Sequence, residues 1–121
     1  MLTFLVAVAA GVGAVMRYVV DEIVEHRTRS PFPTGTLVVN VTGSFVLGLV
    51  TGLALHHGLG THSTAIAGAG FAGGYTTFST WAWESLALTE DGLAWHAVGN
   101  VAGSIAAGLL AAAAGLGIAL L

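Results

Sequence analysis

Residues 70–80 read GFAGGYTTFST and lie in an uncharged segment too long to be one membrane span. No Asp, Glu, Lys or Arg occurs from residue 30 to residue 83, a length of roughly 80 Å as one α-helix. Paired glycines followed by β-branched hydroxyl residues form helix poorly, so residues 70–80 predict a break at mid-membrane. Unwound backbone there must be buried or line a cavity, where its carbonyls are ready ligands for a hard cation. A simple kink relieved by the neighbouring Thr hydroxyls is an equally good interpretation.

The composition of the whole chain indicates a membrane protein. Only 7% of its 121 residues are charged and 55% are hydrophobic, whereas a soluble domain carries roughly 25% charged residues. The chain has no Cys, which excludes disulfides, thiol catalysis and thiolate metal sites. Three basic residues against six acidic ones leave no basic patch for nucleic acid. The expected partners are lipid, small ions and other membrane chains.

Outward from residues 70–80, the apolar runs divide into four expected spans joined by short connections. The spans cover about residues 2–20, 35–55, 63–86 and 94–120 of one four-helix transmembrane domain, residues 1–121. A secretory signal is the alternative for the first span, but Arg17 follows its apolar region, whereas the positive residues of a signal come before it. The predicted fold is therefore an all-α, multi-pass protein of the cell membrane.

Small residues recur at four-residue spacing in the second and fourth expected spans. They are Gly48 and Gly52, Gly99 and Gly103, and the series Ser104, Gly108 and Ala112. Faces of this kind let helix backbones approach closely in lipid. They serve either packing within one bundle or dimerisation, and the sequence leaves both interpretations open.

Several polar side chains fall at depths where hydrocarbon would penalise them. They are Arg17, Asn40, Thr42, Thr76, Thr77, Ser79, Thr80, Glu84, Asn100 and Ser104. An ionisable or amide group inside the membrane needs a partner, a cavity or water, and is a candidate functional residue for that reason. A lone Ser or Thr has a simpler explanation, because its hydroxyl can bond the carbonyl one turn back.

Three motifs occur in order along the chain: GAVMRY at residues 13–18, GTLVVNVTGSF at residues 35–45, and GFAGGYTTFST at residues 70–80. Together they resemble those of the Fluc (CrcB) family of small fluoride channels. The resemblance extends over the whole chain in length, expected spans and motif order. It implies a homodimer of two four-helix subunits, each with a broken third helix, in antiparallel orientation. It also implies two fluoride pores, a structural sodium ion at the dimer centre, and export of cytoplasmic fluoride.

The resemblance also implies roles for individual residues. The backbone carbonyls of Gly73 and Thr76 would hold the sodium ion, with one such pair from each subunit. Asn40 would supply the pore amide and Ser104 would line the same route. Phe78 would be one of the family's two pore phenylalanines.

Fluoride is small and tightly hydrated, so a pore must offer it replacement hydrogen-bond donors without a cation strong enough to trap it. The amide N–H of Asn40 and the hydroxyls of Ser104 and Thr36 meet this requirement. An aromatic ring has a positive edge, so Phe78 can attract an anion weakly without a full charge. The inventory of polar groups therefore agrees with the chemistry that the resemblance implies.

Some positions match the family's pattern and others depart from it. Arg17 matches the first-span arginine, and Glu84 matches the acid that follows the third-span motif. Trp81 stands where the second pore phenylalanine is expected, and its indole N–H is itself a donor. Asn100 and Gly108 replace an expected tyrosine and serine in the fourth span. Asn100 keeps a polar group there, and these departures leave the detailed anion path open.

The three arginines bear on orientation. Arg17, Arg27 and Arg29 fall on or near the side of the membrane opposite the termini, a modest bias that favours termini outside. Either the chain inserts both ways and forms a homodimer, which is the favoured interpretation, or it is fixed and pairs as a heterodimer with an oppositely oriented paralogue.

Two other functions are possible from composition alone. A proton-coupled exporter of small cations needs a buried carboxylate in its first span, and no acid precedes Asp21. A structural subunit of a membrane complex agrees with the small-residue faces but leaves the helix break unexplained. No nucleophile with a paired base is evident, so the chain is not expected to be an enzyme. His56, His57 and His62 can bind a metal, but a solvated turn is favoured.

Overall fold

The computed structural model describes all 121 residues, and every regular element in it is a helix. The long helices are α1 (Leu2–Thr28), α2 (Thr34–His56) and α6 (Ala94–Ala119). Between α2 and α6 the chain forms α3 (Thr61–Thr64), the π-helix η1 (Ala65–Ala72), α4 (Gly73–Tyr75) and α5 (Phe78–Glu90). The predicted all-α fold class is confirmed.

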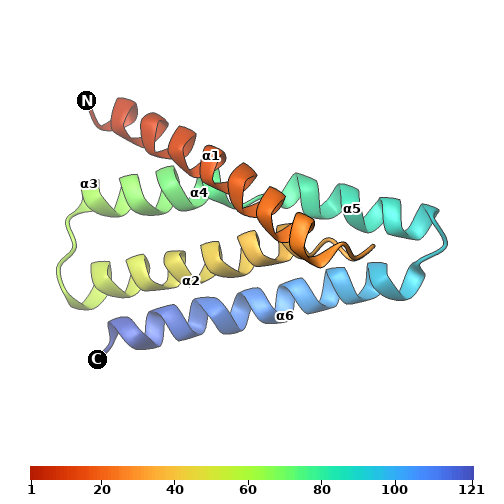
Figure 1. Cartoon of the computed structure of the whole chain (residues 1–121). Coiled ribbons are helices and arrows are strands. Elements are labelled where there is room, and N and C mark those ends of the chain that lie inside the picture. Colours follow the sequence, from red (N-terminus) through yellow and green to blue (C-terminus); the bar gives the residue numbers. More distant parts are fainter.

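Three of these helices, α1, α2 and α6, are long and apolar enough to cross a membrane. Figure 1 shows the shorter helices α3, α4 and α5 following one another along the length of the bundle, beside α2. Both termini lie at the end of the bundle that also holds the α2–α3 connection (Figure 1). Helix α1 continues to Thr28, beyond the expected end of the first span at residue 20.

Helices α2 and α6 pack along their length through small residues. A Cβ atom added at Gly48 would lie 2.1 Å from the carbonyl oxygen of Ala112, and one added at Gly115 would lie 2.2 Å from that of Phe45. Backbone therefore contacts backbone at this interface, as small residues permit in lipid. Packing within one chain explains Gly48, whereas Gly103 has no atom within 4 Å of such a Cβ.

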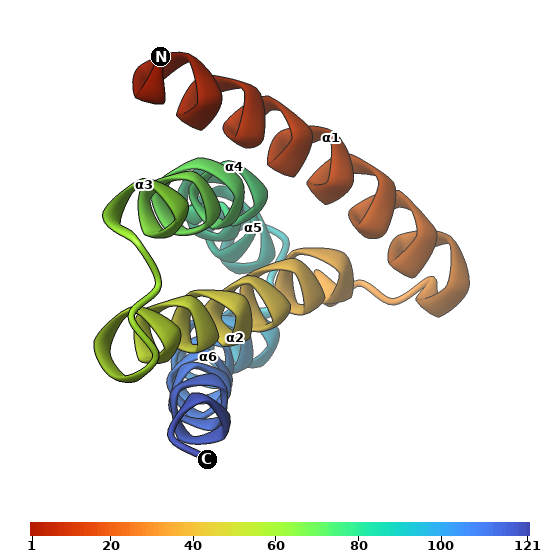
Figure 2. The same cartoon turned by 90° about the vertical axis from the view of Figure 1, so that its left-hand side faces the viewer.

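Helix α1 passes obliquely over η1 and α4 (Figure 2). The contact is again backbone against backbone, because a Cβ at Gly13 would lie 2.3 Å from the carbonyl oxygen of Phe71. On the other side of the contact, a Cβ at Gly74 would lie 2.1 Å from the carbonyl oxygen of Ala10. Because neither glycine has a side chain, α1 can contact the segment that precedes the break.

The clustered histidines lie around the turn between α2 and α3: His56 ends α2, His57 follows it, and His62 lies in α3. The imidazole Nε2 of His57 lies 2.7 Å from the carbonyl oxygen of Ala119 and ties the end of α2 to the end of α6. No three His, Cys, Asp or Glu side chains are grouped closely enough to hold a metal ion. The contact of His57 with Ala119 connects this turn to the C-terminal end of α6.

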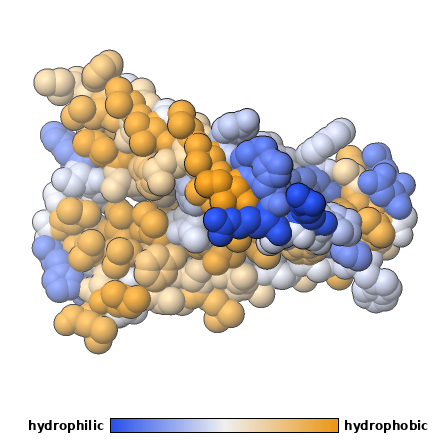
Figure 3. Space-filling view, viewed as in Figure 1, coloured by the Kyte–Doolittle hydropathy of each residue, from blue (hydrophilic) through white to orange (hydrophobic).

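The outer surface of the bundle is largely apolar. Figure 3 shows hydrophobic residues over most of one face, with a hydrophilic patch at the C-terminal end of α1. Large apolar side chains point away from the bundle, among them Phe4 at 68% exposure and Leu110 at 72% exposure. Water would penalise such a surface, whereas lipid would not.

Candidate functional site

The predicted break lies at Thr76 and Thr77, between α4 and α5. Both residues are extended, with φ −79° and ψ 160° at Thr76 and φ −145° and ψ 123° at Thr77. The N–H of Thr76 donates to the carbonyl of Ala72 at 3.0 Å, and its hydroxyl donates to the same oxygen at 2.9 Å. The hydroxyl of Thr77 accepts the N–H of Thr80 at 3.2 Å and caps α5. The break predicted from the sequence is confirmed.

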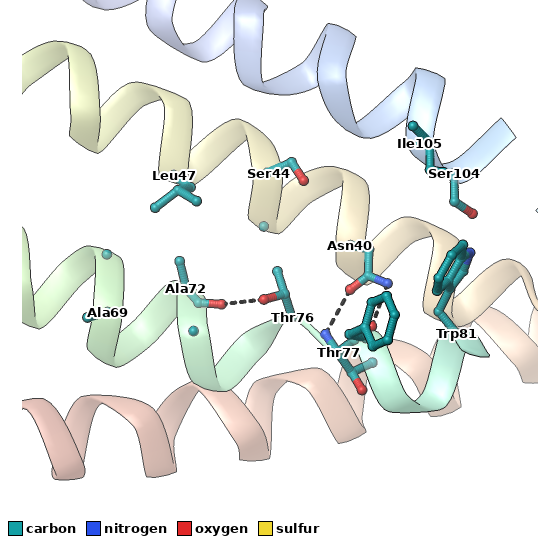
Figure 4. Close-up of a pocket in the computed structure, with 14 residues that line it drawn as sticks. Asn40, Ser44, Leu47, Ala69, Ala72, Thr76, Thr77, Trp81, Ser104 and Ile105 are labelled. Atoms are coloured by element: carbon teal, nitrogen blue, oxygen red, sulfur yellow. Dashed lines mark hydrogen bonds between the residues drawn. The ribbon is translucent and has the colours of Figure 1, made fainter. Parts of the chain in front are cut away.

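Asn40 on α2 holds the unwound backbone of Thr77. Its Nδ2 donates to the Thr77 carbonyl at 2.9 Å, and its Oδ1 accepts the Thr77 N–H at 2.8 Å (Figure 4). An unpaired buried backbone group costs about 1–3 kcal/mol, so this two-bond contact stabilises the break. An Asn amide carries two N–H donors, which leaves one N–H of Asn40 beyond the bond to Thr77.

Arg17 on α1 supports the break from the other side. Its Nη1 donates to the carbonyl of Thr76 at 3.1 Å. The carbonyl of Thr76 is one of the two oxygens that the motif resemblance assigned to sodium. The guanidinium therefore links α1 to the break and satisfies one lone pair of that oxygen.

Replacing Arg17 with Met is expected to lower the free energy of unfolding by about 1.5–3 kcal/mol, the usual contribution of a hydrogen bond to a charged group. The matched control is Arg27→Met, because Arg27 is exposed at the end of α1. Denaturant titration in detergent measures both variants. Equal stability of the two would contradict a structural role for the bond between Arg17 and Thr76.

An open groove of about 710 Å³ lies beside the break, between α2, the segment from η1 to α5, and α6. Seven residues singled out from the sequence line it: Asn40, Gly73, Thr76, Thr77, Phe78, Trp81 and Ser104. Figure 4 shows Asn40, Trp81 and Ser104 grouped on one side of the break. None of the 14 lining residues is charged. The groove therefore offers neutral polar groups and aromatic rings.

Thr36 and Glu84 do not line the groove and form a pair of their own. The Thr36 hydroxyl donates to Oε1 of Glu84 at 2.8 Å, and Thr36 is 2% exposed. The other carboxyl oxygen of Glu84, Oε2, is buried without a hydrogen-bond partner. Close to this pair, the N–H of Gly35 donates to Oε1 of Glu25 at 2.8 Å. The N-terminal turn of α2 is thus bonded to carboxyl groups of both α1 and α5.

Trp81 lines the groove, but its indole N–H is directed to α6. It donates to the backbone carbonyl of Asn100 at 3.1 Å. Asn100 is fully buried and is not among the lining residues. Its Nδ2 donates to the hydroxyl of Ser85 at 2.9 Å, and its Oδ1 accepts from Ser104 at 3.3 Å. The ring of Phe78 is 76% exposed and lies 5.2 Å from the Trp81 ring, centroid to centroid, at 49°.

Sequence reasoning missed two polar contributors. Ser44 lines the groove one helical turn after Asn40, and this spacing on one helix face is a signal that could have found it. Ser85 joins Asn100 across the α5–α6 interface, and no sequence pattern indicates that contact.

These features define a class: a small helical multi-pass membrane protein with a neutral polar groove beside a helix break. A family model described as CrcB-like protein, Camphor Resistance (CrcB), matches residues 4–116. The chain belongs to the CrcB family, which confirms the family resemblance seen in the three motifs.

Several relatives carry the name fluoride-specific ion channel FluC. The chain is 56% identical to FluC 1 of Leifsonia xyli over 86 residues, which cover 71% of this chain and 63% of that protein. It is 46% identical to FluC 1 of Streptomyces avermitilis over 112 residues, covering 93% and 90% of the two chains. It is 44% identical to FluC 2 of Mycobacterium tuberculosis H37Rv over 114 residues, covering 94% and 87%. By name these relatives are channels, not enzymes, in agreement with the sequence-based expectation.

Proposed function

We propose that the chain is a subunit of a fluoride-selective channel, through which cytoplasmic fluoride leaves the cell down its electrochemical gradient. The names of the relatives support this assignment. The observation that carries it is the amide of Asn40 in the groove, fixed by two bonds to Thr77 with one N–H left over. That N–H is a neutral donor for an anion.

The uncharged lining of the groove suits a small anion. A conducting site must bind strongly enough to replace hydration and weakly enough to release the ion. Carboxylates in the lining would repel fluoride, and a cationic side chain would hold it. The hydroxyl of Ser44 and the exposed ring of Phe78 attract an anion without repelling or trapping it, whereas the single O–H of Ser104 already donates to Asn100.

We also propose that residues 61–90 cross the membrane as a fourth span made of two half-helices, and that two chains pair in antiparallel orientation. The extended backbone at the break supports burial against protein, because such backbone is not stable against lipid. The open side of the groove exposes Gly73 and Phe78, which a second chain would cover. A homodimer needs no further component, and an oppositely oriented paralogue is the alternative partner.

The break would supply half of the oxygen ligands of a structural sodium ion, through the carbonyls of Gly73 and Thr76. The amides of Thr76 and Thr77 donate to other groups, so neither occupies the carbonyl of Gly73. The carbonyl of Thr76 accepts one bond from Arg17 and keeps a second lone pair. Two carbonyls are too few for one hard cation, so the second chain would supply the other pair. Sodium held there would join the two chains.

Removal of sodium is expected to lower the thermal stability of the purified protein. A ligand at 100 times its Kd stabilises the state that binds it by about 2.7 kcal/mol. Thermal unfolding in a sodium salt should therefore give a higher Tm than unfolding at the same concentration of an N-methyl-D-glucamine salt. The same Tm in both salts would count against a bound sodium ion.

The direction of transport can be tested in cells. Expression in a bacterium that lacks its own fluoride exporters should restore growth on fluoride-containing medium and lower the cytoplasmic fluoride concentration. A membrane-inserted protein that leaves growth and cytoplasmic fluoride unchanged would contradict the export function. The alternative functions of cation export and a purely structural role both predict that negative outcome.

A further inference from the structure

Trp81, Ser85 and Asn100 form a closed ring of hydrogen bonds between α5 and α6. The indole N–H of Trp81 donates to the carbonyl of Asn100 at 3.1 Å. The side-chain amide of Asn100 donates to the hydroxyl of Ser85 at 2.9 Å. The hydroxyl of Ser85 in turn donates to the carbonyl of Trp81 at 2.8 Å. Trp81 is therefore tied to Asn100 through its ring and through its backbone.

The position of Asn100 suits a role in this ring of hydrogen bonds and not direct contact with an ion. It is fully buried, and both polar atoms of its side chain have protein partners, Ser85 and Ser104. It does not line the groove, whereas Trp81 and Ser104 do. A buried amide is costly unless it is bonded, so these contacts favour one arrangement of the α5–α6 interface.

We propose that Asn100 is a positioning residue that keeps the Trp81 indole N–H out of the anion path. The inference rests on the proposed fluoride channel function. It concerns how strongly the same groove holds the anion. With its N–H bonded to Asn100, Trp81 offers the groove only the carbon edge and the face of its ring. The backbone carbonyl of Asn100 accepts the indole N–H, and the Asn100 side chain holds Trp81 opposite that carbonyl through Ser85, so no contact between Asn100 and the ion is required.

The consequence for conduction follows from the strength of the available donors. An indole N–H is a full hydrogen-bond donor, whereas a ring edge attracts an anion weakly. A second fixed N–H donor next to Phe78, in addition to the amide of Asn40, would bind the anion more strongly and slow its release. Because the Phe78 and Trp81 rings lie 5.2 Å apart, the position of the indole also sets the surroundings of Phe78.

The test follows the Trp81 indole N–H by ¹H–¹⁵N NMR in Trp83→Phe, Trp95→Phe protein. Those two side chains are 67% and 85% exposed and lie outside the groove, so their replacement leaves one indole signal. We expect slow hydrogen exchange and no change of the signal on titration with sodium fluoride, with sodium chloride as control. A fluoride-dependent shift of this signal would overturn the proposal.

The second arm compares Asn100→Leu with a matched control, Thr89→Val. The Thr89 hydroxyl lies one turn beyond Ser85 and bonds only the Ser85 carbonyl. Asn100→Leu keeps the backbone carbonyl that accepts the Trp81 indole N–H but removes the Asn100–Ser85 bond that holds α5 against this carbonyl, so hydrogen exchange of the indole N–H is expected to speed up about tenfold, within the range for one lost interhelical bond in lipid. Asn100→Leu is also expected to make that N–H shift with fluoride, whereas Thr89→Val changes neither property.

Ser85→Ala breaks the same ring without removing Asn100, so it tests the proposal if Asn100→Leu does not fold. Ser85→Ala is also expected to speed hydrogen exchange of the Trp81 indole N–H. If either Asn100→Leu or Ser85→Ala folds and the Trp81 indole N–H exchanges hydrogen at the unmodified rate, the positioning role is overturned. It is also overturned if the indole N–H exchanges fast in a variant that still conducts fluoride but its signal does not shift with fluoride. Absence of fluoride efflux from the unmodified protein would instead refute the channel function, which separates the two failures.

Discussion

Replacing Asn40 with Asp is expected to lower fluoride efflux by about 1,000-fold. Two like charges 4 Å apart repel by about 4 kcal/mol at the effective dielectric constant of a protein surface, and each 1.4 kcal/mol is a factor of ten. A carboxylate at this position would face the anion in the groove and would also lack the N–H that bonds the Thr77 carbonyl. The variant therefore loses a donor and gains a repelling charge at once.

The measurement is the initial rate of fluoride release from liposomes, read with a fluoride electrode. Thr61→Asp is the control, because Thr61 is exposed at the first residue of α3, beside the α2–α3 turn, and does not line the groove. Both proteins should elute as single species in size-exclusion chromatography. Fluoride release by the Asn40 variant at the unmodified rate would show that Asn40 does not line the anion path.

Gly74→Ala is expected to prevent correct folding or to destabilise the protein by about 3 kcal/mol or more, as severe overpacking does. The added Cβ would lie 2.1 Å from the carbonyl oxygen of Ala10. Backbone atoms of α1 cannot rotate away as a flexible side chain would, so α1 must move off the segment before the break. That movement would also pull Arg17 from the Thr76 carbonyl.

Gly117→Ala makes the same chemical change where a Cβ meets no atom within 4 Å. It lies in α6, so it should leave stability unchanged or raise it by up to about 1 kcal/mol through helix propensity. Thermal unfolding and the yield of monodisperse protein compare the two variants. Equal behaviour would contradict the close contact of α1 with α4.

The break could be predicted because its cause is local. Gly73 and Gly74 followed by Thr76 and Thr77 disfavour helix whatever surrounds them, and the structure places the extended residues there. The π-helical geometry of η1 could not be foreseen, because residue propensities do not distinguish its hydrogen bonds from those of an α-helix. The continuation of α1 to Thr28 was missed for a different reason: hydropathy indicates where lipid ends, not where a helix ends.

The partners of the polar groups depended on tertiary contacts that the sequence does not display. Depth in the membrane singled out Glu84 and Asn100 as residues needing partners, whereas Thr36 was named as a donor for fluoride and Trp81 as a departure from the family's pattern. The structure pairs Thr36 with Glu84 across α2 and α5, and Trp81 with Asn100 across α5 and α6. Both pairings require knowing which helix faces meet. Asn40, by contrast, was named as a pore residue because it lies in the motif at residues 35–45, and in the structure it lines the groove.

The most direct measurement is the relative efflux of fluoride and chloride from liposomes containing the purified protein. Fluoride should leave rapidly once the membrane potential is relieved with a potassium ionophore, while chloride release stays at the level of protein-free vesicles. Equal release of both anions, or release of neither from vesicles that contain folded protein, would contradict a fluoride-selective path through the groove.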